Sequence, residues 1–258
     1  MTVPARWSVD LNADMGEGFG RYALDDGALL SVVTSASVAC GFHAGDPLVM
    51  RATATNATRH GVVIGAHPGY PDLVGFGRRD LGATPAEIEA MVIYQTGAMA
   101  AMCAAAGTTL RYVKPHGALY NRAARDAAAA GAIARAVRLV DPSLVLLGLA
   151  GSELVAAAAR AGVRAATEGF VDRAYASDGT LVPRSEPGAV LSDVAAVARR
   201  AVQMVKSGSV EAIDGTTIEL HVDSLCTHGD GANAVEMVRA VRAALENEDV
   251  RIAPFARD

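Results

Sequence analysis

Histidine and acidic side chains that could do chemistry gather at a few points along this chain, each time beside glycine. Four histidines lie in polar segments that follow apolar runs: CGFHAGD at 40–46, GAHPGYPD at 65–72, VKPHGALYN at 113–121 and CTHGDGAN at 226–233. Strand ends followed by glycine-rich loops are where parallel α/β folds place ligand-binding and catalytic groups. Several such segments along one chain predict a single pocket assembled from distant parts of the sequence.

A fifth segment, DLNADMGEGFG at 10–20, supplies carboxylates in the same setting. Strand alternation places Asp10, Asn12 and Asp14 on one side of an extended chain, and Glu17 follows them. We expect this group to hold a substrate, a cation or a water. The alternative is an Asx-type turn that only caps the loop, but four acceptors exceed what one turn uses.

His43 has no evident local duty after its strand, so we expect it in the site. Asp46 has one, because it precedes Pro47 and can cap a helix. Cys40 lies inside the apolar run and fits a small core residue better than a nucleophile. His60 comes directly before a glycine at a predicted helix end, where we expect it to face water.

His67 precedes a Pro-Gly turn and is predicted to face the pocket mouth, with Tyr70 as a candidate for substrate binding. The chain contains no HExxH or paired CxxC spacing, so no standard zinc motif is present. Acidic and histidine side chains from separate strand ends could still bind a divalent ion, and Asp14, His43 and His67 are the candidates.

Lys114 is one of two lysines in the chain, the other being Lys206, among 23 basic residues. A lysine retained in so arginine-rich a sequence suggests a required point charge or titratable amine, although chance remains the alternative. His116 lies two residues further on and is a second catalytic candidate. Asn121, in the same segment, is a substrate-binding candidate.

Arg173 and Arg184 lie in a long loop and could bind a carboxylate or a phosphate through paired hydrogen bonds. A surface ion pair between Arg173 and Asp172 is the competing interpretation.

Towards the end of the chain, His228 and Asp230 are predicted to be catalytic residues in a loop. His221 and Asp223 precede them in a predicted strand and could point inward together, or His221 could be an ordinary core residue.

The remaining pattern alternates strands with helices, which predicts a parallel sheet covered by helices. The predicted strands are 7–11, 36–40, 62–66, 110–114, 144–149, 164–170 and 217–225. The predicted helices are 47–60, 85–106, 123–139, 151–161, 191–206 and 232–246. Two long glycine- and proline-rich segments, 68–84 and 171–190, interrupt this alternation and are expected to be ordered loops near the pocket. A single (β/α) barrel domain spanning 1–258 accommodates all of these elements.

Composition narrows the class of protein. A formal net charge of -5 and a pI near 5.7 argue against a nucleic-acid partner. Neither a signal peptide nor a long uninterrupted apolar stretch is recognisable, so no membrane partner is expected. Three cysteines without CxxC spacing fit reduced thiols in the cytoplasm. No P-loop motif is present, so any nucleotide would bind in another way.

The motifs quoted above, together with EGFVDRAYASDGTLVPRSEPGAVL at 168–191, closely resemble the LamB/YcsF family over about residues 7–250. The resemblance implies a distorted seven-stranded (β/α) TIM-like barrel of the glycoside hydrolase and deacetylase type. It also implies ATP-dependent hydrolysis of the lactam of 5-oxo-L-proline to L-glutamate, with ADP and phosphate as products. ATP, with magnesium, would be a co-substrate, and subunits of the PxpB and PxpC type would be partners.

If the resemblance holds, Asp14, His43 or His67 would position or deprotonate the attacking water. Lys114 and His116 would stabilise developing negative charge, and Arg173 would hold the substrate carboxylate. Two rival functions remain: a metal-dependent deacetylase or sugar hydrolase, and a noncatalytic subunit that binds a ligand. The sequence leaves open a bound metal, a homo-oligomer and the subunit that binds ATP.

Overall fold

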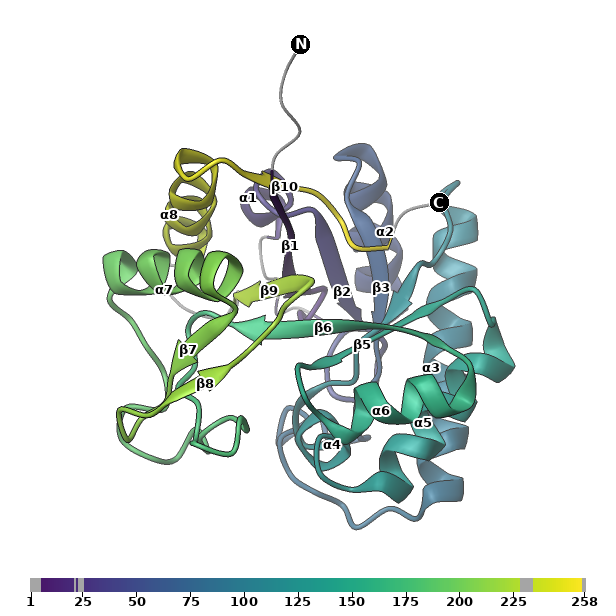
Figure 1. Ribbon diagram of the computed structural model, residues 1–258. Coiled ribbons are helices and arrows are strands. Elements are labelled where there is room, and N and C mark those ends of the chain that lie inside the picture. The colour runs from purple at the N-terminus through teal and green to yellow at the C-terminus, as the bar shows by residue number, and fades with distance from the viewer. Residues whose placement is uncertain (1–5, 21, 23–25, 228–233, 257–258) are drawn as a thin grey trace.

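The computed structural model describes residues 6–20, 22, 26–227 and 234–256. Its centre is a closed barrel of parallel strands, which confirms the predicted distorted seven-stranded (β/α) barrel (Figure 1). In barrel order the strands are β1 (Trp7–Met15), β2 (Ser35–Ala39), β3 (Val63–His67), β4 (Tyr112–Val113), β5 (Val145–Leu149), β6 (Arg164–Phe170) and β9 (Ser224–Thr227), and β9 pairs with β1. The short strand β10 (Val250–Ile252) pairs with the first residues of β1.

Helices cover the outside of the barrel. They are α1 (Gly27–Leu30), α2 (Pro47–Arg59), α3 (Pro85–Ala105), α4 (Gly117–Ala123), α5 (Ala127–Val140), α6 (Glu153–Ala161), α7 (Val194–Ser207) and α8 (Ala234–Asn247). In Figure 1, α3 to α6 gather on one side of the barrel and α7 with α8 on the other. Much of the buried core between helices and strands is alanine, whose small side chain lets the helices approach the sheet closely.

Local signals fix where several helices begin. Asp46 accepts hydrogen bonds from the first backbone amides of α2, as predicted, and Thr84 forms a capping box with Glu87 at the start of α3. Two helix starts differ from the prediction. Asp126 caps α5 and so separates it from α4, and Asp193 caps α7, inside the predicted start at 191.

The predicted strand 217–225 is wrong. Its first part is β8 (Thr217–Glu219), which pairs antiparallel with β7 (Ser209–Glu211) in a separate two-stranded sheet beside α7 (Figure 1). Its polar–apolar alternation is typical of an antiparallel strand with one face in water, whereas a parallel barrel strand is buried on both faces. The barrel strand β9 starts only at Ser224, so His221 and Asp223 are exposed and do not point into the barrel.

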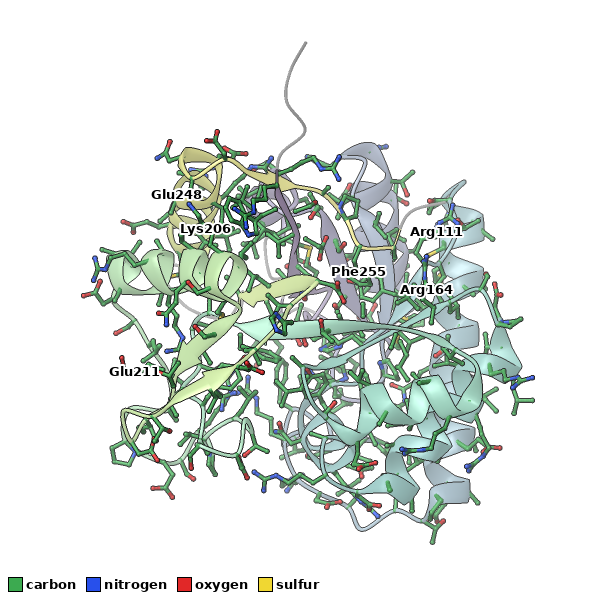
Figure 2. The ribbon with its side chains drawn as sticks, in the orientation of Figure 1. Arg111, Arg164, Lys206, Glu211, Glu248 and Phe255 are labelled. Atoms are coloured by element: carbon green, nitrogen blue, oxygen red, sulfur yellow. The ribbon has the colours of Figure 1, made fainter. Side chains whose placement is uncertain are left out.

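The amino-terminal end of the barrel is closed by aromatic packing. Phe255, labelled in Figure 2, lies against Tyr112 with the ring centroids 5.0 Å apart. The hydroxyl groups of Tyr112 and Ser37 are 3.0 Å apart in the barrel interior. This packing lies at the opposite end of the barrel from the strand ends that carry the candidate residues.

Among the described residues, α3 alone is long and apolar enough to cross a membrane by length and composition. One face of it packs against its neighbours, with Ile88, Val92, Met99 and Cys103 fully buried, and its other face is exposed.

Candidate active site

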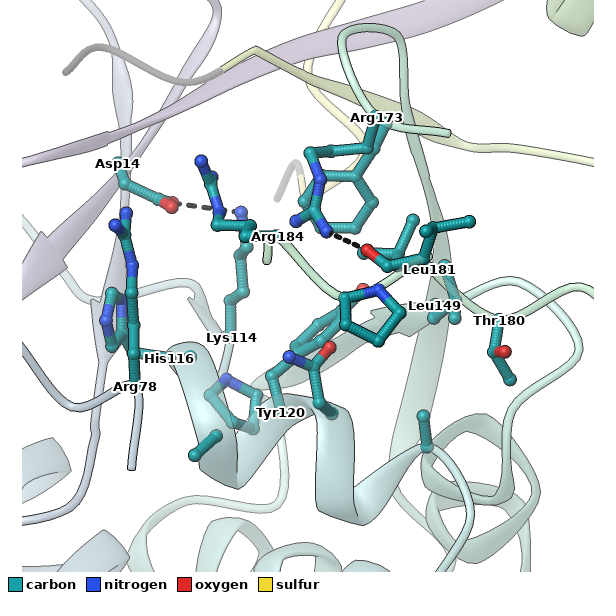
Figure 3. A pocket seen from close by; sticks show the side chains of 18 of the residues that line it. Asp14, Arg78, Lys114, His116, Tyr120, Leu149, Arg173, Thr180, Leu181 and Arg184 are labelled. Carbon is teal, nitrogen blue, oxygen red and sulfur yellow. Dashed lines mark hydrogen bonds and ion pairs between the residues drawn. The ribbon is translucent and has the colours of Figure 1, made fainter. Parts of the chain in front are cut away.

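A cavity of about 430 Å³ opens at the carboxyl ends of the barrel strands. Small-molecule sites commonly have volumes of about 300–1,000 Å³. The candidate residues that line it are Asp14, Glu17, His67, Lys114, His116, Asn121, Arg173 and Arg184. Figure 3 shows Asp14 and His116 on one side of this pocket and Arg173 on the other. Segments that lie far apart in the chain thus meet at one rim, as the sequence predicted.

Lys114 lies at the base of this pocket with only 2% of its surface exposed. Its Nζ is 2.8 Å from Glu168 Oε1, 2.9 Å from Asp14 Oδ1, 3.2 Å from Asn12 Oδ1 and 3.2 Å from Cys226 Sγ. The Asp14 contact is drawn as a dashed line in Figure 3. We call Asn12, Asp14, Lys114 and Glu168 the lysine network.

Charge in this network keeps the lysine protonated. Burial by itself lowers the pKa of Lys114, but the opposing effect of Asp14, Cys226 and Glu168 is larger and raises that pKa well above 10.5. Lys114 is therefore a fixed ammonium, which selects the point charge over the titratable amine that the sequence also allowed.

Glu168 was missed by the sequence analysis, although it completes the network. It is fully buried in β6, where Oε1 also accepts from Asn12 Nδ2 at 3.0 Å and Oε2 accepts from the Tyr120 hydroxyl at 2.7 Å. Asn12 is held wholly within this network and does not line the cavity. A charged residue inside the apolar strand 164–170 was the available signal, since an acid is almost never fully buried without partners.

The network continues to Asp10, a second fully buried carboxyl group in the barrel. Asn12 Nδ2 donates to Ser224 Oγ at 2.8 Å, and Ser224 in turn donates to Asp10. Thr34 and Ser35 also donate to Asp10, both at 2.6 Å. Burial nevertheless raises the pKa of Asp10 to about 6.

A second group, which we call the histidine cluster, consists of Glu17, His43, His67 and His116. His67 Nε2 lies 2.9 Å from His116 Nδ1 and 3.3 Å from Asp14 Oδ2. Glu17 Oε1 lies 3.6 Å from His43 Nε2 and 3.7 Å from His116 Nδ1. The rings of His43 and His116 stack with centroids 3.7 Å apart. Of the predicted metal candidates, His43 and His67 belong to this cluster and Asp14 lies beside it, while Glu17 and His116 are additional donors.

Burial keeps two of these imidazoles neutral. The pKa of His116 is lowered to about 3, first by burial and then by the charge of His67. Burial, followed by the charges of His116 and His67, also lowers the pKa of His43 well below 6.5. Neutral imidazole is the form that accepts a proton or binds a metal ion.

Two glycines allow the backbone to approach the histidine rings. A Cβ at Gly69 would lie 2.7 Å from His43 Nδ1, and a Cβ at Gly77 would lie 2.7 Å from His43 Cβ and 2.8 Å from His116 Cδ2. Gly77 also has a φ of +63°, which disfavours other residues. Both belong to the loop 68–84, so this predicted loop forms one wall of the cluster.

Arg173 and Arg184 enter the pocket from the other loop, 171–190 (Figure 3). Arg173 donates to the backbone carbonyls of Val182 and Ala189 and is buried, so a surface ion pair does not describe it. Burial and the nearby charge of Arg184 lower the pKa of Arg173 to about 10. Two neighbouring guanidinium groups of this kind are suited to an anion.

Two other candidates are buried outside the cavity lining. His43 is buried behind the cavity lining rather than in it. Tyr70 is not among the lining residues; it is fully buried, and its hydroxyl faces Arg122 Nη1 at 3.4 Å. The Pro-Gly turn before Tyr70 directs its side chain towards α4, away from the mouth. His228 and Asp230 lie outside the described residues.

The structure also confirms two predictions about single residues, Cys40 and His60. Cys40 is buried with a pKa raised to about 12 by burial, as expected of a core thiol. His60 is exposed at the end of α2, as predicted.

Comparison with known proteins places these features in context. The sequence model of the LamB/YcsF family matches residues 9–258. A protein of Paracidovorax citrulli named as the A subunit of 5-oxoprolinase is 54% identical over 249 residues, covering 96% of this chain and 99% of the relative. A Pyrococcus furiosus protein with the same name is 51% identical over 248 residues, covering 96% and 97%. The crystal structure of a lactam utilization protein from Thermus thermophilus superposes with a TM-score of 0.91 at 48% identity, covering 96% of this chain and 100% of that one.

Proposed function

The chain belongs to the LamB/YcsF family, and from this premise we propose that it is the A subunit of a 5-oxoprolinase, a cyclic amide hydrolase that opens 5-oxo-L-proline to L-glutamate. The proposed reaction consumes ATP, with magnesium, and requires partner subunits of the PxpB and PxpC type. Its place is the cytoplasm, where the three buried, unpaired cysteines would remain reduced.

The observation that carries this proposal is the pairing of a fixed ammonium with two guanidinium groups in one small cavity. Of the described residues that line it, five are basic (Arg78, Lys114, Arg125, Arg173 and Arg184) and two are acidic (Asp14 and Glu17). Such a pocket favours an anionic ligand, and 5-oxoproline carries one carboxylate. Phosphorylation would add further negative charge to the reacting group.

A lactam resists hydrolysis because its amide resonance must be broken and its amine leaves poorly. ATP would overcome this by transferring its γ-phosphoryl group to the lactam oxygen, with ADP leaving. Water then adds to the ring carbon and the C–N bond breaks as the nitrogen takes a proton. The resulting acyl phosphate reacts with a second water to give glutamate and phosphate.

The residues of this chain fit separate parts of that sequence. Lys114 Nζ provides a preorganised positive charge for the developing oxyanion or the phosphoryl oxygens. Asp14 lies beside the cavity, 3.3 Å from His67, where its carboxylate positions and deprotonates the attacking water. Arg173, with Arg184 beside it, holds the substrate carboxylate.

The test is glutamate formation by the chain combined with its PxpB- and PxpC-type partners, with ADP production measured in parallel. We expect stoichiometric ADP and glutamate, and no turnover when the chain is omitted. Absence of glutamate from the fully assembled complex would refute the proposal.

The carboxylate contact can be tested within the same assay. Arg184→Met should raise KM for 5-oxoproline about 10- to 100-fold, the loss expected for a hydrogen bond to a charged group. Because 2-pyrrolidinone lacks the carboxylate, its turnover should be poor and insensitive to the substitution. Arg135→Met is the control, since Arg135 pairs with Glu89 on the surface. Equal KM effects on both lactams would show that Arg184 does not contact the carboxylate.

A further inference from the structure

The histidine cluster contains a hydrogen-bonding problem that the protein groups do not solve. His67 Nδ1 lies 2.7 Å from the carbonyl oxygen of Lys114, and His116 Nε2 lies 2.8 Å from the carbonyl oxygen of Phe76. A carbonyl only accepts, so each of these ring nitrogens must carry the hydrogen. In neutral rings, the opposite nitrogens then carry lone pairs. These are His67 Nε2 and His116 Nδ1, which face each other at 2.9 Å.

His43 presents the same problem independently. Both of its ring nitrogens are buried without a hydrogen-bond partner, and only 1% of the residue is exposed. Leaving such groups unpaired is costly, which is why buried polar atoms nearly always have a partner. Its Nε2 points towards Glu17 Oε1 at 3.6 Å, too far for a hydrogen bond but a normal separation for two ligands of one ion.

We propose that Glu17, His43, His67 and His116 bind a divalent first-row transition-metal ion. One ligand atom from each residue lies within 4.8 Å of all the others, so the four donors lie close enough together to share one ion. Three imidazole nitrogens with one carboxylate oxygen form a donor set suited to zinc and to the neighbouring ions that prefer imidazole. A cation at this point accepts the facing lone pairs of His67 and His116 and gives His43 a partner.

The surroundings support the same assignment. Metal-binding histidines usually donate their second ring nitrogen to a carbonyl or carboxylate, which fixes the ring and the tautomer. The carbonyls of Lys114 and Phe76 do this here for His67 and His116. Asp14 Oδ2, 3.3 Å from His67 Nε2, lies beside the proposed ion and could bind it or accept a proton from a water on it.

A shared proton between His67 and His116 is the alternative to a metal ion. It would require one of the two rings to carry a second proton and a positive charge. It would also leave both nitrogens of His43 without a partner, since His43 makes no hydrogen bond to either ring. A metal ion resolves both problems at once.

Glu17, His67 and His116 also line the substrate cavity, so the ion would be accessible from it. A bound ion there could polarise a carbonyl oxygen or lower the pKa of a bound water. The site itself is inferred from the donor geometry alone and does not depend on the identity of the substrate.

The test uses the isolated full chain, freed of metal by chelation and then titrated with Zn²⁺ by calorimetry. We expect one ion per chain with a dissociation constant below about 1 µM, a level that ordinary surface groups do not reach. Titration with Co²⁺ should produce the visible absorption of a cobalt ion bound by imidazole nitrogens.

The informative variant is His43→Phe, which keeps a ring stacked on His116 while removing both nitrogens. Loss of a ligand should weaken Zn²⁺ binding by more than the roughly 10- to 100-fold typical of an outer-shell partner. The metal-free variant should be at least as stable as the metal-free wild type, because two unpaired buried nitrogens are gone. His60→Phe, at an exposed histidine, should bind as wild type does.

Failure to bind Zn²⁺ or Co²⁺ stoichiometrically overturns the proposal, as does binding that His43→Phe leaves unchanged. If His43→Phe fails to fold, Glu17→Gln takes its place with the same expected loss. The outcome is separable from the proposed function, because metal binding is measured without substrate or partners. Oxoprolinase activity in a chain that binds no metal would refute the ion and retain the enzyme.

Discussion

The lysine network and the histidine cluster are neighbours in the barrel. They differ in whether protein atoms alone supply all of their hydrogen-bond partners. Lys114 and His116 are two residues apart, yet every polar atom around Lys114 Nζ has a partner within the protein. In the histidine cluster, both ring nitrogens of His43 lack a hydrogen-bond partner, and the lone pairs of His67 Nε2 and His116 Nδ1 face each other. A complete network holds a charge in place, whereas an incomplete one indicates a group that arrives from outside. Substitutions in the two groups should therefore affect folding and ligand binding in different proportions.

The largest effect is expected from Lys114→Met, which keeps the length of the side chain and removes its charge. Glu168 would then be fully buried without the lysine cation, and breaking a buried pair in this way costs about 3–5 kcal/mol of the free energy of unfolding. Turnover should fall at least about 100-fold, the lower range for one lost oxyanion donor. Urea unfolding and glutamate formation measure the two losses.

Lys206→Met is the matched control for that substitution, since Lys206 is the only other lysine. It pairs with Glu248 on the surface between α7 and α8 (Figure 2), where an ion pair contributes about 1 kcal/mol or less. If Lys114→Met were no more destabilising than Lys206→Met, the lysine network would not be a structural unit.

The same difference between local and distant contacts explains which features the sequence could predict. Helix caps and strand ends depend on neighbouring residues. For this reason, the role of Asp46 as a helix cap and the position of His67 at the cavity were predicted correctly. Glu168 depends on contacts with Asn12 and Tyr120, 156 and 48 residues away, and no local motif marks it. The exposed position of His221 was missed for a related reason, because the alternation in 217–225 could not show which sheet the strand joins.

The state of each ionisable group was even less predictable. The sequence allowed Lys114 to be a titratable amine, and only the acids that surround it in the fold determine that it stays charged. Likewise, the carbonyls of Lys114 and Phe76 determine which nitrogens of His67 and His116 face each other. Such information comes from backbone atoms brought together by the barrel, which residue types alone do not encode.

A smaller effect is expected at Asp10 in the barrel interior. The side chains that donate hydrogen bonds to its carboxylate are the neutral hydroxyl groups of Thr34, Ser35 and Ser224. Burial raises its pKa from 3.8 to about 6. Between these values the unfolded chain releases the proton first, so the folded state binds more protons and its stability falls as pH rises. The two-unit span corresponds to about 3 kcal/mol.

Asp10→Asn removes this titration. The free energy of unfolding of the variant minus that of wild type should therefore increase by about 3 kcal/mol between about pH 3.5 and pH 7, as measured by urea unfolding at each pH. Taking the difference cancels the titration of groups that do not interact with Asp10. A difference that is constant with pH would mean that the three hydroxyls stabilise the ionised carboxylate fully.

The smallest expected change in stability concerns the loop that forms one wall of the histidine cluster. It can be measured by comparing alanine substitutions at two glycines that have the same backbone conformation. Gly77 and Gly82 have φ values of +63° and +62°, so alanine should cost about 1 kcal/mol at either position through backbone strain. A Cβ at Gly82 meets nothing within 4 Å, but one at Gly77 would lie 2.7 Å from His43 Cβ. Gly77→Ala should therefore cost about 1–2 kcal/mol more, the range for a crowded core methyl.

The difference between these two variants isolates the contact with the histidine rings, because the strain is common to both. Gly82→Ala should keep wild-type turnover and Zn²⁺ affinity. Gly77→Ala should lower both, since the backbone can admit the methyl group only by displacing His43 or His116 from the other donors. If the two variants behaved alike in unfolding and in Zn²⁺ titration, the donor positions would tolerate displacement. The contrast between a rigidly completed lysine network and a cluster preorganised for an ion would then no longer hold.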